Sequence, residues 1–126
     1  MTKQEMLQLK MTATRVRMGI IEATHGGKSG HPGGSLSAAD VLTYLYFKEM
    51  QIDPQNPQDP DRDRFVLSKG HAAPGLYSVL AERGFFPVAD LPTLRHSNSY
   101  LQGHPNMNTV PGVDMLSLIH ISEPTR

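Results

Sequence analysis

The chain has 126 residues, 12 of them basic and 12 acidic, and this zero net charge argues against a nucleic-acid or membrane-surface partner, since either usually needs a basic patch. The absence of cysteine excludes disulfides and thiolate metal sites and fits a cytoplasmic protein. The length allows at most one domain, and no apolar run is long enough to cross a bilayer.

The first predicted element is an amphipathic helix over residues 3–24. Thr2 and Glu5 have the spacing of a capping box at its start, and Gly26-Gly27 has the composition of a helix end. Apolar residues recur at steps of three and four and should mark its inner face: Met6, Leu9, Ala13, Val16, Ile20 and Ile21.

A loop rich in glycine and proline follows, at residues 28–35. Its glycines allow positive φ and close approach of other groups, which disfavours both helix and strand. Pro32 stiffens the backbone and biases His31 toward extended geometry. This loop is suited to presenting the imidazole of His31 to a ligand.

A second helix is predicted to start near Ser35 or Ser37, because residues 37–40 have the pattern of another capping box. Its inward-facing side chains should be Val41, Leu42, Leu45 and Tyr46, with Met50 as a further candidate. Residues 52–64, with three prolines and four aspartates, predict a connector made of turns.

Residues 65–67, Phe-Val-Leu, are typical of a short buried strand. A third helix should follow the turn at Gly70-His71, with Pro74 in its first turn, Leu76, Tyr77 and Leu80 inward, and Gly84 as its stop. Residues 87–95 predict one short helix weakened by Pro92, and residues 96–114 predict a loop.

Helices alternating with a strand predict an α/β fold with a mostly parallel sheet. Parallel strands need neighbours on both sides, so a single strand implies that the fold is incomplete within this sequence.

Three histidines follow a glycine: His31, His71 and His104. They are compatible with a three-histidine metal site, although no carboxylate that would orient the rings is evident nearby. They are also suited to donating protons and hydrogen bonds to an oxygen-rich substrate. A third interpretation is that they are three unrelated loop histidines.

Four blocks in order then resemble the start of a transketolase. They are Ser29-Gly30-His31-Pro32-Gly33-Gly34, residues 63–72 (Asp-Arg-Phe-Val-Leu-Ser-Lys-Gly-His-Ala), residues 101–105 (Leu-Gln-Gly-His-Pro) and residues 111–114 (Pro-Gly-Val-Asp). The likeness covers residues 5–115. It is nearest to the bacterial split form, in which an N-terminal subunit pairs with a separate C-terminal one.

The resemblance implies an enzyme of the pentose phosphate pathway that uses thiamine diphosphate and Mg²⁺ to move a two-carbon ketol unit between sugar phosphates. It implies that His31, His71 and His104 are catalytic, that His71 approaches the cofactor diphosphate, and that His31 and His104 contact substrate hydroxyls. The implied partners are sugar phosphates and a C-terminal half or subunit, in a homo- or hetero-oligomer.

The resemblance ends near Met115. Residues 1–115 are then part of a transketolase N-terminal domain, and residues 116–126 resemble read-through of an adapter or a shifted frame. The Gly-Asp-Gly element and later Asn that hold the metal in this family are absent, as is the glutamate that activates the cofactor. We therefore expect the chain alone to be inactive, and the alternative outside the family is a non-catalytic, histidine-based metal-binding module.

Overall fold

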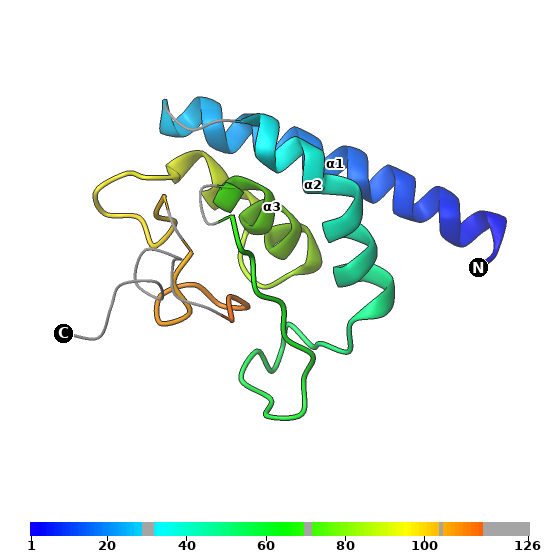
Figure 1. The fold of residues 1–126 in the computed structure, drawn as a ribbon. Helices are drawn as coiled ribbons and strands as arrows, with labels where there is room; N and C mark the ends of the chain where they lie inside the picture. The colour runs from blue at the N-terminus through cyan, green and yellow to red at the C-terminus, as the bar shows by residue number, and fades with distance from the viewer. Residues whose placement is uncertain (29–31, 70–71, 104, 115–126) are drawn as a thin grey trace.

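A computed structural model describes residues 1–28, 32–69, 72–103 and 105–114. Its helices are α1 (Lys3–Gly27), α2 (Pro32–Tyr44) and α3 (Ala73–Arg83), with a π-helical turn η1 (Leu45–Glu49) and a 3₁₀ helix η3 (Val88–Thr93). In Figure 1, α1 and α2 lie side by side across α3, and each of these three helices contacts the other two.

Helix α1 begins as predicted and ends three residues later. Thr2 accepts a hydrogen bond from the Glu5 N–H at 3.0 Å, while the Glu5 carboxylate accepts one from Lys48 at 2.9 Å instead of closing a capping box. The helix runs through Gly27, and Lys28 takes the left-handed conformation with φ of 52°. A lysine therefore occupies the position that usually favours glycine.

Gly26 and Gly27 serve close packing rather than the helix end. A Cβ on Gly26 would lie 2.3 Å from the carbonyl oxygen of Pro92, and a Cβ on Gly27 would lie 2.8 Å from that of Leu94. Both contacts are too short for any side chain, so the glycine pair lets the end of α1 touch the backbone at and just after η3.

The predicted inner face of α1 is correct at its centre and wrong for Met6 and Ile21, which are 48% and 50% exposed. Small residues replace them because the neighbouring helices come close; a Cβ on Gly19 would lie 2.2 Å from the Ser78 hydroxyl oxygen. The buried residues of α1 are Thr12, Ala13, Val16, Gly19, Ile20 and Ala23.

Helix α2 begins at Pro32, earlier than either predicted start. Proline is tolerated in a first turn, where its missing N–H costs nothing. Ser37 lies inside the helix, and its hydroxyl donates to the Gly34 carbonyl at 2.9 Å. Leu42 is buried as predicted, whereas Val41 is 61% exposed, which corrects that part of the prediction.

The predicted strand at residues 65–67 is wrong for this structure, and no strand occurs anywhere in the described ranges. A strand needs a neighbouring backbone to pair with, and the Phe65 N–H donates instead to the Asp114 carboxylate at 3.0 Å. The described part of the molecule is helical, so the parallel sheet of the predicted α/β fold is not confirmed.

Helix α3 matches its prediction. Pro74 lies in the first turn, and Gly84 ends the helix with φ of 108°. Every residue from Ala73 to Ala81 is buried, so α3 is the centre of the core. The largest fully buried side chains are Tyr77, Ile20, Leu42, Leu76, Leu80, Leu91, Leu94 and Leu101.

The connecting segments also match. Residues 52–64 form successive turns, in which Asp53 and Asp59 accept from backbone N–H groups two residues ahead, at 2.9 and 3.0 Å. Pro92 lies inside η3, which is the short helix predicted over residues 87–95. Within residues 96–103 and 105–114, the described chain forms only turns and loops.

Candidate functional site

The three predicted site histidines, His31, His71 and His104, lie outside the described residues. Residues within a few positions of each histidine are described, and five hydrogen bonds link these flanking segments across the fold. The candidate site is therefore built here from the segments that flank the histidines.

Ser35 joins the first histidine segment to the second. It is fully buried on α2, its hydroxyl donates to the Ala72 carbonyl at 3.2 Å, and it accepts from the Gly75 N–H at 3.0 Å. Ala72 itself offers α3 no side-chain cap. Ser35 thus caps α3 from a neighbouring helix and holds the residues after His71 beside the first turn of α2.

Lys69 makes a second link between these segments. Its ammonium group donates to the Gly34 carbonyl at 3.1 Å and to the Ser37 hydroxyl at 3.2 Å. Lys69 lies two residues before His71, and Gly34 lies three residues after His31. The described residues before and after His71 are therefore both hydrogen-bonded to the beginning of α2.

Tyr77 brings the third histidine segment to α3. Its phenol donates to the Gln102 carbonyl at 2.6 Å, two residues before His104. Burial raises the pKa of the Tyr77 phenol, so this donor keeps its proton at any physiological pH. Close by, a Cβ on Gly103 would lie 3.2 Å from the Arg95 guanidinium, so glycine leaves room for that side chain.

A largely buried ion pair holds residues 111–114, the fourth block of the family pattern, in place. A guanidinium nitrogen of Arg62 lies 2.5 Å from a carboxylate oxygen of Asp114, and the two side chains are 13% and 4% exposed. The sequence alone did not predict a partner for Asp114. The signal that could have found the pair is an acidic residue in an otherwise apolar, glycine-containing turn, which rarely stays buried without a cation.

The same ion pair affects the tyrosine beside it. Burial, reinforced by the negative charge of Asp114, raises the pKa of Tyr46 on η1. Tyr46 also packs edge-on against Phe65, with ring centroids 5.9 Å apart. Phe65, whose N–H donates to the Asp114 carboxylate, therefore links the turn at residues 111–114 to η1.

This arrangement favours an anionic ligand. The described starts of α2 and α3 adjoin the positions of His31 and His71, and helix N-termini carry partial positive charge that attracts phosphate groups. The Lys69 ammonium adds a full positive charge beside the first turns of α2. The sign of this charge suits a phosphate group, whereas no group of three metal-ligating side chains occurs among the described residues.

The metal-binding alternative is untested by this geometry, since its three histidines are outside the described ranges. As for membranes, none of the helices in the described parts of the chain has the length and apolar character that a bilayer-spanning segment requires.

Residues 8–117 match the family described as transketolase, thiamine diphosphate binding domain. The transketolase of Homo sapiens is 50% identical over 103 residues, which are 82% of this chain and 16% of that protein. The 6-deoxy-6-sulfo-D-fructose transketolase subunit SqwG of Clostridium sp. (strain MSTE9) is 44% identical over 112 residues, 89% of this chain and 41% of that subunit.

Solved structures agree. The transketolase from Leishmania mexicana superposes with a TM-score of 0.82 at 34% identity, covering 86% of this chain and 16% of that one. The chain thus spans about a sixth of the full-length relatives that it matches. The family match covers residues 8–117, and the structural match covers 86% of the chain. The chain therefore belongs to the transketolase family, as part of its thiamine diphosphate-binding domain.

Proposed function

We propose that this chain is the N-terminal part of a transketolase, which transfers a two-carbon ketol unit from a ketose phosphate to an aldose phosphate. The observation that carries the proposal is the set of contacts that ties the flanks of His31, His71 and His104 around the start of α3. These contacts connect the segments in which the transketolase resemblance expects site histidines, and they support a shared site over three unrelated loop histidines.

Thiamine diphosphate is the cofactor that suits this site. When bound, it supplies the carbanion that cleaves and forms the carbon–carbon bond. His71, aided by the positive ends of α2 and α3, would hold the diphosphate. The Mg²⁺ of the family would need ligands from beyond residue 115, since its Gly-Asp-Gly element is not in this sequence.

His31 and His104 would act on the sugar. Cleaving a ketose requires removal of a proton from a hydroxyl beside the breaking bond, and forming the new one requires returning it. Imidazole has an ordinary pKa near neutrality, so one side chain serves as both base and acid. We therefore assign these two histidines to substrate hydroxyls.

We also propose the substrates, the cellular location and the partner of this enzyme. The substrates are sugar phosphates of the pentose phosphate pathway, and the enzyme is cytoplasmic. A C-terminal half or separate subunit completes it within an oligomer, as the names of the split-type subunits among the relatives suggest. We place the end of the domain segment at residue 115, two residues before the end of the family match, and take residues 116–126, which lie outside the described ranges, as a tail that departs from the family.

A chimera tests the proposal. Residues 1–114 replace the matching segment of a complete transketolase, and ketol transfer is measured with thiamine diphosphate and Mg²⁺. We expect the chimera to be active and residues 1–126 alone to be inactive. A chimera that folds and assembles but transfers no ketol unit would contradict the proposal, as would turnover by the isolated chain.

A further inference from the structure

Helix α1 carries large apolar side chains on the face opposite the core. Leu7, Met11, Met18 and Ile21 are 57%, 47%, 59% and 50% exposed. Single exposed apolar residues are ordinary, but four on one helix face are a surface that needs an explanation.

The spacing of these residues is that of a helix–helix seam. From Leu7 the steps are four, seven and three, and Thr14 lies within the step of seven. Positions 7, 11, 14, 18 and 21 therefore alternate steps of four and three, which is the repeat of a coiled coil. We call this row the outer seam of α1.

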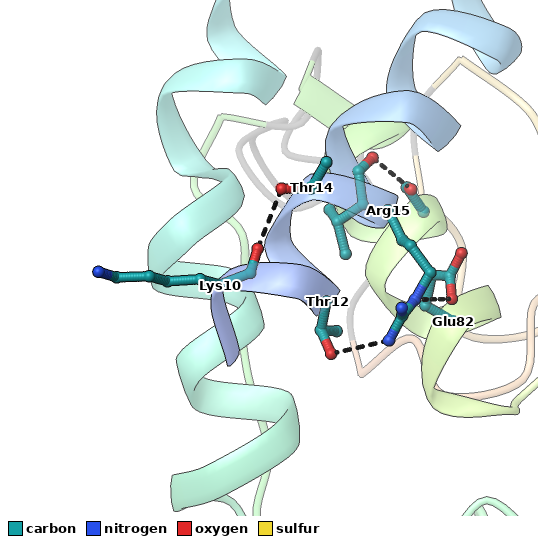
Figure 2. Close-up of polar contacts among 7 residues, drawn as sticks. Lys10, Thr12, Thr14, Arg15 and Glu82 are labelled. Atoms are coloured by element: carbon teal, nitrogen blue, oxygen red, sulfur yellow. Dashed lines mark hydrogen bonds and ion pairs between the residues drawn. The ribbon is translucent and has the colours of Figure 1, made fainter. Parts of the chain in front are cut away.

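Basic residues border one side of the outer seam at seven-residue intervals: Lys3, Lys10 and Arg17. Arg17 is paired with Asp40 at 2.8 Å, whereas neither lysine has an ion pair within the described parts of the chain. Figure 2 shows Lys10 and Arg15 extending from α1 in opposite directions, with Arg15 turned toward Glu82, 3.7 Å away. The free positive charge thus lies on one border only.

This charge selects among possible occupants. A second copy packed antiparallel would set the basic row against itself. A parallel copy would bring Lys10 toward Arg15. The opposite charge that it would offer, Glu22, would face Arg17, which is already paired with Asp40. A membrane surface prefers a wide apolar face, while this seam is a narrow row with Thr14 at its middle. A helix with apolar knobs and carboxylates beside them satisfies both the seam and the lysines.

We propose that the outer seam of α1 docks an amphipathic helix with an acidic border, supplied by a partner subunit. The inference rests on the proposed function only for the source of that helix. Docking would bury the four apolar side chains and pair Lys3 and Lys10 with carboxylates, so it would weaken as salt increases.

The test uses a synthetic three-heptad peptide with leucine at its seam positions and glutamate at its borders, labelled for fluorescence anisotropy. The chain should bind it, and the double variant Leu7→Gln, Met18→Gln should bind at least tenfold more weakly. Val41→Gln is the matched control, because Val41 is 61% exposed on α2, and it should change affinity less than twofold. Circular dichroism checks that each variant keeps its helices.

The charge arm uses the same peptide with lysine borders, which should bind at least tenfold more weakly than the glutamate peptide. Lys10→Glu should reduce the ratio of the two dissociation constants at least threefold. Equal binding of both peptides, tighter binding to phosphatidylserine vesicles than to the peptide, or seam-dependent dimers in sedimentation would overturn the proposal. No arm needs cofactor or turnover, so these results stand apart from the failure or success of the ketol-transfer assay.

Discussion

Helices α1 and α3 begin as the sequence predicts, but they are buried differently. Every residue of α3 from Ala73 to Ala81 is buried. Helix α1 buries one face and exposes Leu7, Met11, Met18 and Ile21 on the other. The chain thus completes the surroundings of α3 and supplies only half of those of α1.

The difference teaches that a helix forms from local signals while its burial depends on partners. A cap, a glycine stop and apolar periodicity define where a helix begins and ends. Which side chains are covered depends on what packs against them. Within the parts of this chain that the structure describes, nothing packs over the exposed apolar face of α1 that carries Leu7, Met11, Met18 and Ile21.

The largest expected effect is on the core side of this comparison. Leu76→Ala should lower the free energy of unfolding by about 2–5 kcal/mol, because Leu76 is 1% exposed and its removal leaves a cavity. Urea denaturation followed by circular dichroism measures it. A loss below about 1 kcal/mol would mean that α3 is not packed as described.

The cap that α2 gives to α3 predicts the next effect. Ser35→Ala should lower the free energy of unfolding by about 1–3 kcal/mol, because it leaves the buried Gly75 N–H without its acceptor. Ser37→Ala is the matched control, since Ser37 is exposed on the same helix. This variant should change the free energy of unfolding by no more than about 0.5 kcal/mol. Equal losses for the two variants would refute the cap.

The dependence of stability on alkaline pH tests how deeply Tyr77 on α3 is buried. Burial raises the pKa of Tyr77, so above pH about 10 the unfolded chain binds fewer protons than the folded one, and stability falls as pH rises from there. The limiting slope is about 1.4 kcal/mol per pH unit for one tyrosine. Tyr77→Phe should make the measured slope shallower.

Tyr44→Phe is the control for that experiment. Tyr44 is exposed, and its pKa is raised by its hydrogen bond to Glu49 rather than by burial. Removing its hydroxyl should leave most of the alkaline loss in place. If it flattened the profile as much as Tyr77→Phe does, burial in α3 would not be the cause.

The smallest effect is expected on the outer seam. Leu7→Gln and Met18→Gln should each change stability by less than about 0.5 kcal/mol in the isolated chain, because both side chains already face solvent. Urea denaturation of the two variants checks this. A loss above about 1 kcal/mol would show that the seam is already covered within the chain.

Much of this fold could be predicted from the sequence. Thr2, Pro74 and Gly84 gave correct helix signals because each acts through its own backbone neighbours. Met6, Ile21 and Val41 were assigned to inner faces wrongly, since periodicity alone does not say which of two apolar rows meets the core.

The site residues stay a prediction, because His31, His71 and His104 lie outside the described residues. The structure adds hydrogen bonds between the segments that flank them. The roles of Ser35 and Lys69 were missed because their partners lie more than 30 residues away along the chain. The strand at residues 65–67 was wrong because its prediction assumed neighbouring strands that the described residues do not provide.

The central claim is that the segments around His31, His71 and His104 form one ketol-transfer site. The most direct measurement is kcat/KM for His71→Ala in a complete transketolase carrying residues 1–114, with His96→Ala as control. His96 is exposed, and its ring contacts the Gly26 carbonyl at 3.0 Å and takes part in none of the hydrogen bonds that link the flanks. We predict at least a tenfold fall for His71→Ala and less than a twofold change for His96→Ala. Wild-type kinetics for His71→Ala would contradict the account.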